Sequence, residues 1–188
     1  MKVGITTHYY NSNNYGGNLQ AYALCQVLQK NGVQAEQICY SALTKKRTPF
    51  QILKEKGLVA FCKLVAKRVL GVFKKIFNKN KKIKGFIAQR KANILAFNQK
   101  IPHSDVVYNQ DNIVEANDKY DMFITGSDQV WHPSAINKAY TLEFVKNKPK
   151  ISYAASLSVS ELSDNQKEYF KEFIKDYSAV SVREENSV

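Results

Sequence analysis

The apolar and polar positions of this chain follow two alternating patterns: short apolar runs, and longer stretches with apolar residues every three or four positions. Short runs are typical of buried strands, and the longer stretches are typical of helices with one apolar face. Strands are predicted at 3–7, 33–40, 120–125, 150–155 and 179–182. Helices are predicted at 17–30, 83–99, 112–116 and 163–175. Because strand, helix and strand follow one another at the start, we expect parallel strands with right-handed crossovers, and therefore a three-layer α/β fold.

A basic amphipathic stretch separates the second predicted strand from the third. Over residues 58–77 apolar side chains recur at three- and four-residue steps, and the lysines fall largely outside that stripe. From 45 to 100 the chain has 17 Lys and Arg but a single acid, Glu55, whereas the remainder is mildly acidic. We therefore predict one domain over 1–188 that carries a basic helical insertion at 45–101.

The basic segment 51–84 leaves two interpretations open. Either it lies against an anionic membrane, where each Lys or Arg adds ~1 kcal/mol of attraction, or it packs its apolar stripe on the sheet with its lysines in water. The first interpretation places the protein at the inner face of a membrane, where lipid-linked glycans are held. Nucleic acid is not a predicted partner, because aromatic residues are not interleaved with the basic ones in a stacking pattern.

Composition narrows the class of protein and its location. The chain is 44% hydrophobic and 23% charged, which is ordinary for a soluble globular protein. Its three cysteines (Cys25, Cys39 and Cys62) have no metal-ligand spacing, and their odd number does not suggest a disulfide framework. The sequence shows no signal peptide and no apolar run near the ~20 residues that span a bilayer. We therefore expect a cytoplasmic protein that needs no metal and no cofactor.

The distinctive polar segments share one location, since each directly follows a predicted strand. Ligand crevices of open parallel sheets lie beyond the carboxyl ends of the strands. Several segments that converge on this edge make it the candidate site. The segments are 8–18, 126–133, 156–158 and 183–184.

The segment after the first strand is rich in Asn and Gly, with Gly16 and Gly17 immediately before a predicted helix. These residue types tolerate left-handed backbone angles and permit a sharp turn. A helix N-terminus behind such a turn has free N–H groups and partial positive charge, which suit a phosphate or a carboxylate. The alternative is a plain turn that joins strand to helix.

The segment after the third strand is the most specific. Ser127, Asp128 and Gln129 supply a hydroxyl, a carboxylate and an amide beside Trp131, the one tryptophan of the chain. Polar groups next to a flat indole suit a sugar ring, which has hydroxyls on its edges and C–H groups on its faces. The alternative is a turn capped by Asp128, with Trp131 as an anchor in the core.

Four segments carry a resemblance to a known family. They are NYGGNLQAYAL at 14–24, GSDQVW at 126–131, KISYAAS at 150–156 and SVRE at 181–184. In this order and context they resemble the amino-terminal half of the polysaccharide pyruvyl transferase family. The resemblance spans nearly the whole chain apart from the basic insertion, and GSDQVW is its most specific part.

The resemblance implies a Rossmann-like domain that forms the first half of a two-domain architecture similar to B-type glycosyltransferases. It also implies an activity, in which phosphoenolpyruvate is the donor substrate and pyruvate is transferred as a ketal to a hexose of a cell-surface polysaccharide, such as a capsule or exopolysaccharide. The acceptor is then a polysaccharide or a lipid-linked glycan. Members of the family usually continue into a second Rossmann-like half that holds much of the donor site, whereas this chain ends at Val188. We therefore expect an incomplete active site that needs a second domain or a partner chain.

A ketal-forming transfer needs a base for the sugar hydroxyl and an acid for the enol carbon. Asp128 and His132 are the candidate catalytic residues. The alternative for Asp128 is a structural carboxylate that binds backbone N–H groups. The alternative for His132 is a polar residue at the rim that transfers no proton. Arg183 could clamp a phosphate or carboxylate, or else pair with Glu184 or Glu185. The candidate substrate-binding residues are His8, Asn14, Tyr15, Gly16, Gly17, Asn18, Gln20, Ser127, Gln129, Trp131 and Arg183.

Two other functions fit the same residues. A nucleotide-sugar glycosyltransferase domain would use the same architecture with a different donor. A non-catalytic remnant that binds a glycan or a partner protein would need the surface but no chemistry.

Overall fold

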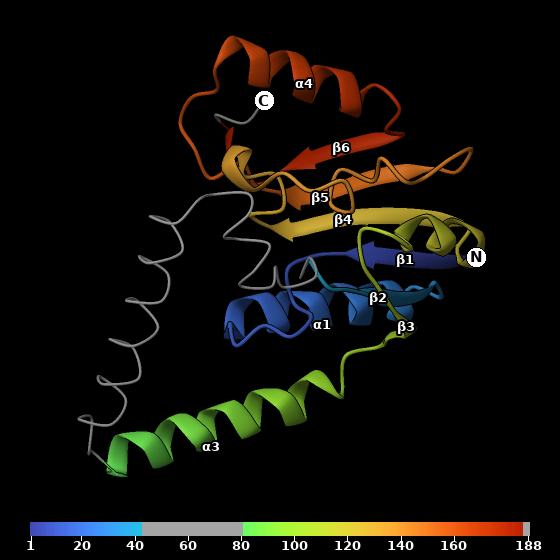
Figure 1. Ribbon diagram of the computed structural model, residues 1–188. Coiled ribbons are helices and arrows are strands. Elements are labelled where there is room, and N and C mark those ends of the chain that lie inside the picture. The colour runs from blue at the N-terminus through green and yellow to red at the C-terminus, as the bar shows by residue number, and fades with distance from the viewer. Residues whose placement is uncertain (43–80, 186–188) are drawn as a thin grey trace, which may run out of the picture. The chain divides into compact units, whose positions relative to one another are not determined.

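The structure, a computed structural model, describes residues 1–42 and 81–185 (Figure 1). The chain divides into two compact units, one made of 1–42 and 94–188 and the other of 43–93. The first unit holds a six-stranded parallel sheet. Its strands are β1 (Lys2–Thr6), β2 (Gln34–Tyr40), β3 (His103–Tyr108), β4 (Met122–Asp128), β5 (Lys150–Ala155) and β6 (Ala179–Val182).

The strand order is β3-β2-β1-β4-β5-β6, which confirms the Rossmann-like prediction (Figure 1). β2 and β3 are added on one side of β1, and β4, β5 and β6 are then added on its other side. β1 and β4 are hydrogen-bonded neighbours, with Ile5 beside Ile124 and Thr6 beside Thr125. The topological switch point therefore lies between the carboxyl ends of β1 and β4, where open α/β sheets bind ligands.

Two apolar layers cover opposite faces of the sheet. Successive strand residues point to opposite faces, so Phe123 and Ile124 of β4 belong to different layers. Ile124 packs with Ile5 of β1 and with Cys25 of α1 (Tyr15–Lys30). Phe123 belongs to the larger cluster, to which α4 (Asp164–Ile174) contributes Phe170. The sheet is thus enclosed between α1 on one face and α4 on the other.

Most predicted elements are present with small shifts at their ends. The helices α1 and α4 match the predictions at 17–30 and 163–175, and a 3₁₀ helix, η1 (Ile113–Lys119), stands near the short helix predicted at 112–116. α4 begins with a capping box, in which Ser163 and Gln166 bond reciprocally. Gly32 follows α1 with φ of 77°, as expected of a glycine that ends a helix.

Strand β3 is absent from the prediction, which gave five strands. It follows Pro102 and pairs with β2 at the edge of the sheet, where His103 lies beside Gln37 and Tyr108 beside Tyr40. Only two of its six side chains, Ser104 and Tyr108, are buried. Such an edge strand lacks the continuous apolar run by which the central strands were found.

Little of the predicted insertion falls within the described residues. The helix predicted at 83–99 is present as α3 (Lys81–Asn98). Residues 43–80 lie outside the described part, so the insertion at 45–101 and the membrane-facing role of 51–84 stay predictions. Within 1–42 and 81–185, no helix has the length and apolar character needed to cross a membrane.

Candidate functional site

The candidate site lies at the switch point, where β1 and β4 end side by side. Thr7 follows β1 directly, and its Oγ1 donates a 2.6 Å hydrogen bond to the carbonyl of Ser127. Gln20 of α1 donates from Nε2 to Thr7 Oγ1 over 2.8 Å. The ends of both strands and the start of α1 are therefore tied together. We call this set of residues the switch-point rim: Thr7, His8, Gly17, Ser127 and Asp128.

Gly17 is required by the close packing of this rim. A Cβ atom at Gly17 would lie 2.6 Å from the carbonyl oxygen of His8, closer than real Cβ contacts, and 3.6 Å from Asp128 Oδ2. A glycine here lets the start of α1 approach the segment after β1 and brings the Asp128 carboxylate beside it. The structure therefore shows the predicted convergence of the polar segments 8–18 and 126–133.

The carboxylate beside α1 changes the interpretation of that helix start. A partial positive charge at a helix N-terminus stabilises a nearby anion. Here the anion is a side chain of the protein itself, Asp128, and the N–H of Gly16 is already capped by Asn14 Oδ1 at 3.0 Å. An internal carboxylate thus lies beside the start of α1, and the sequence-based interpretation of this turn as a site for a phosphate or carboxylate of a ligand stays a prediction.

Asp128 is held in an unusual backbone conformation. Its φ is 95°, in the left-handed region that non-glycine residues rarely adopt. Its Oδ1 accepts a 2.9 Å bond from the N–H of Gln129, and its carbonyl accepts bonds from Val130 and Ser156. Gly126 nearby also has a positive φ, 109°. Residues held in such conformations concentrate at functional sites.

His8 lies half-buried in the same rim. Its ring packs against the ring of Tyr140, with centroids 4.3 Å apart. Burial lowers the pKa of His8, and this is only partly offset by the Asp128 charge and by a hydrogen bond to the backbone of Gln129. The imidazole is therefore neutral at pH 7, with a carboxylate close to it.

Trp131 does not lie in the crevice, which corrects the predicted stacking of a sugar on its face. The indole is 2% exposed and packs edge-on against Phe173 of α4, with ring centroids 5.3 Å apart. Its Nε1 donates a 3.2 Å bond to the carbonyl of Tyr140. The structure therefore bears out the alternative, a core anchor, because the apolar ring finds its partners between the sheet and α4.

His132, the second candidate catalytic residue, has a local structural role. Its Nδ1 accepts a 3.2 Å bond from the N–H of Ser134 and caps the 3₁₀ helix η2 (Pro133–Ala135). This contact occupies one ring nitrogen. A catalytic role for His132 stays a prediction that would have to use the other nitrogen.

The remaining candidate residues fall into three groups. Asn14, Tyr15, Gly16 and Gln129 are exposed around the rim. Asn18 is 1% exposed, donates from Nδ2 to the carbonyl of Ser12, and supports the loop from inside. Arg183 lies after β6, where its Nε bonds Glu184 at 2.9 Å, so the predicted alternative of an ion pair is present. Whether these residues bind substrate stays a prediction.

The polar segments 156–158 and 183–184 also meet each other. Ser156, after β5, donates from Oγ to Glu184 over 2.7 Å. The carboxylate of Glu184 thus links the ends of β5 and β6, and these hydrogen bonds lower its pKa. Ser156 also donates its N–H to the carbonyl of Asp128, which connects this pair to the switch-point rim.

Two residues of the site were missed in the sequence. Thr7 was counted as the last residue of a strand, although its hydroxyl ties β1 to β4. Tyr140 belongs to an irregular segment without periodicity, so no pattern indicated that its ring would pack on His8. Both act through contacts between distant segments, which a local pattern does not reveal.

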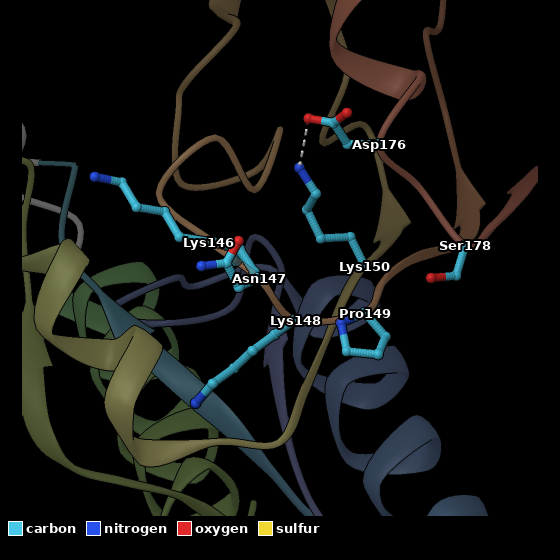
Figure 2. A pocket seen from close by; sticks show the side chains of 8 residues that line it. Lys146, Asn147, Lys148, Pro149, Lys150, Asp176 and Ser178 are labelled. Atoms are coloured by element: carbon cyan, nitrogen blue, oxygen red, sulfur yellow. Dashed lines mark ion pairs between the residues drawn. The ribbon is translucent and has the colours of Figure 1, made fainter.

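A cavity of about 670 Å³ lies at the opposite edge of the sheet, around the start of β5 (Figure 2). Three lysines line it, but their side chains point in different directions (Figure 2). Lys150 Nζ pairs with Asp176 at 3.5 Å, and Lys148 Nζ donates to the carbonyl of Tyr120 at 2.6 Å. Because the Lys148 and Lys150 ammonium groups have separate partners and the three side chains do not converge, these lysines do not form an anion site.

A groove of about 540 Å³ runs between α1 and the β5–β6 edge. It is lined largely by apolar side chains, such as Leu24 and Val27 of α1 and Val180 of β6. Gln20 and Ser127 form its end at the switch-point rim. The site thus opens onto a mostly apolar channel along one face of the sheet.

Among the residues that the structure describes, no group of three or more His, Cys, Asp or Glu is placed to hold a metal ion. The arrangement instead offers a carboxylate, a neutral imidazole and a backbone turn at one rim. Comparison with known proteins adds one finding: the family model described as polysaccharide pyruvyl transferase matches residues 14–188. No curated protein and no solved structure matches the chain.

Proposed function

The chain belongs to the polysaccharide pyruvyl transferase family, and from this premise we propose that it takes part in transferring pyruvate from phosphoenolpyruvate to a hexose of a cell-surface polysaccharide, as a ketal. The observation that carries the proposal is that the family segments at 14–24 and 126–131 meet at the switch-point rim. A site at this place in an open sheet is where a ligand is expected.

The groups at the rim suit the acceptor sugar better than the donor. Sugar hydroxyls both donate and accept hydrogen bonds, and the rim offers a carboxylate acceptor in Asp128 and polar groups in His8 and Ser127. Phosphoenolpyruvate carries a phosphate and a carboxylate, which call for cationic partners. The rim places its own carboxylate beside α1, and like charges repel. We therefore assign the acceptor to the switch-point rim, and the donor to basic residues beyond it.

The reaction has a simple balance. Two hydroxyl oxygens of the hexose form bonds to C2 of phosphoenolpyruvate, the C2=C3 double bond is lost, and the bond from C2 to the phosphate oxygen breaks. Of the two hydroxyl protons, one ends on C3, which becomes a methyl group, and one leaves with the phosphate. The protein has to position two hydroxyls and move protons, and it needs no redox chemistry.

Transfer from isotopically labelled phosphoenolpyruvate to a hexose-containing polysaccharide tests the proposal, with the full chain assayed alone and with the product of a neighbouring gene. Label recovered in the polysaccharide as an acid-labile ketal, together with released phosphate, supports it. Transfer from a nucleotide sugar in place of phosphoenolpyruvate would show a glycosyltransferase. Glycan binding without transfer from either donor would show a non-catalytic binding module.

A further inference from the structure

Three elements converge on His8. β4 ends with Asp128, whose carboxylate lies at the same rim, the segment before β5 brings the ring of Tyr140 against the imidazole, and α1 brings Gly17 against the His8 carbonyl. Burial raises the pKa of Tyr140, so that phenol stays uncharged and does not compete for protons near pH 7. The charged groups that face His8 are therefore the Asp128 carboxylate and the positive end of α1.

The surroundings of His8 suit a base. A neutral imidazole has one nitrogen that donates and one that accepts a proton. The His8 ring is held by its packing on Tyr140, with centroids 4.3 Å apart, and the Asp128 carboxylate lies at the same rim, next to Gly17 and the His8 backbone. A half-buried imidazole held in place, with a carboxylate nearby, is an arrangement that suits general-base catalysis.

We propose that His8 is the catalytic base of the transfer and that Asp128 is its positioning residue. This inference rests on the proposed function for the reaction that it serves. It differs from the sequence prediction, which gave proton transfer to Asp128 and His132 and only substrate binding to His8.

The step balances without an external acid or base. As the first sugar hydroxyl bonds to C2 of phosphoenolpyruvate, its proton passes to the free nitrogen of His8. The electron pair of the C2=C3 bond takes up that proton at C3, and the imidazole becomes neutral again. The second hydroxyl oxygen then displaces phosphate from C2, and the phosphate leaves with the bonding electron pair and the second proton.

The structure favours His8 over the other two candidates. His132 uses Nδ1 to cap η2. Asp128 has Oδ1 bonded to the N–H of Gln129 at 2.9 Å and Oδ2 beside the start of α1, so both carboxylate oxygens lie against groups of the protein itself. His8 combines a neutral ring with a nearby anion that stabilises the imidazolium as it forms.

An NMR titration of the imidazole tests the pair without any assay of activity. The His8 signal is assigned by its loss in His8→Gln and followed with pH in the wild type and in Asp128→Asn. His8 should titrate below the ordinary value of about 6.5, and below its own wild-type value in Asp128→Asn, because the carboxylate raises its pKa. Titration at or above the ordinary value, or no change in Asp128→Asn, would overturn the pair.

Kinetics then test the role. His8→Gln and His8→Asn should lower kcat by about 10²- to 10⁴-fold, typical of a lost general base, with little change in KM for phosphoenolpyruvate. In Asp128→Asn the acid limb of the pH profile should move to lower pH together with the His8 pKa. His103→Gln is the matched control and should keep wild-type kcat, because that exposed ring lies at the start of edge strand β3.

The outcomes separate the two proposals. A wild-type chain that transfers pyruvate while both His8 variants keep full kcat overturns the role of His8 and leaves the function intact. A wild-type chain that transfers no pyruvate, either alone or with the product of a neighbouring gene, overturns the function. A structural role would lower the unfolding midpoint of the His8 variants without changing their pH profile, and this result would also count against the base.

Discussion

Trp131 offers the sharpest test of how this site is built, because the sequence left two roles open and the structure shows one of them. The indole is 2% exposed and lies edge-on to Phe173 and Tyr177, with centroids 5.3 and 5.9 Å away. Removing it in Trp131→Ala leaves a cavity between the sheet and α4. Buried Trp or Phe replaced by Ala typically costs about 3–5 kcal/mol of unfolding free energy, and we expect a value in that range.

Trp131→Phe separates packing from hydrogen bonding. The variant keeps one ring in the cluster but loses the Nε1 donor to the Tyr140 carbonyl. That carbonyl still accepts a 2.7 Å bond from Thr125 Oγ1, so it does not become an unsatisfied buried group. The lost hydrogen bond therefore costs about 0.5–1.5 kcal/mol, and with the reduced ring volume we expect a total of about 1–3 kcal/mol, toward the lower end of what core truncations cost.

Urea unfolding measures both values. Trp131 is the one tryptophan of the chain, so its variants lose the usual fluorescence signal and all proteins should be followed by far-UV circular dichroism. Phe86→Ala is the matched control, because that side chain is 75% exposed and its loss should change stability by no more than about 0.5 kcal/mol. Wild-type stability of Trp131→Phe together with weaker binding of the acceptor glycan would refute the core assignment and restore the sugar platform.

Four further measurements follow from the described contacts and from the sequence. Gly17→Ala should lower the free energy of unfolding in urea by about 1–3 kcal/mol, because its Cβ would lie 2.6 Å from the His8 carbonyl oxygen. Gly16→Ala is the control and should leave that free energy nearly unchanged, because its Cβ would meet its nearest atom at 3.4 Å. Ser163→Ala should cost about 1 kcal/mol by the same measurement, since it removes the capping box of α4. The pKa of His8 is lower in the folded state than in the unfolded chain, so stability should be full above about pH 6.5 and decline as the pH falls below it; this slope should be smaller in His8→Gln. If 51–84 binds membranes, the chain should co-sediment with anionic vesicles at low salt and be released by added salt, whereas no binding at low salt would contradict that role.

The central strands of this fold could be predicted because each is a short apolar run, and their order follows from parallel pairing and crossover handedness. The edge strand β3 could not, because its exposed positions are free to be polar and its sequence, HSDVVY, has no continuous apolar run. The end of β4 was also misplaced. The strand continues through Ser127 and Asp128, which read as loop residues because polar residues are rare in a buried strand.

The candidate site was predictable in its location and only partly in its roles. The location of the rim could be predicted from the ends of the strands, because the topology brings these ends to one edge of the sheet. The orientation of a side chain could not be predicted in this way, as Trp131 shows. An indole three residues after Asp128 can turn outward to a ligand or inward to the core, and the choice depends on α4, which begins more than thirty residues later. Contacts of that range leave no local signature.

The same reasoning explains why the Asn- and Gly-rich turn suggested a site for an anionic ligand. The sequence correctly indicated a helix start that favours negative charge, but it did not show which negative charge would occupy it. The fold places Asp128 there, beside Gly17 and near a neutral His8. Gly17 leaves room for that carboxylate beside the helix start. The glycines of this segment are thus best understood as what permits a carboxylate, an imidazole and a helix N-terminus to occupy one rim, where an uncharged sugar hydroxyl could meet them.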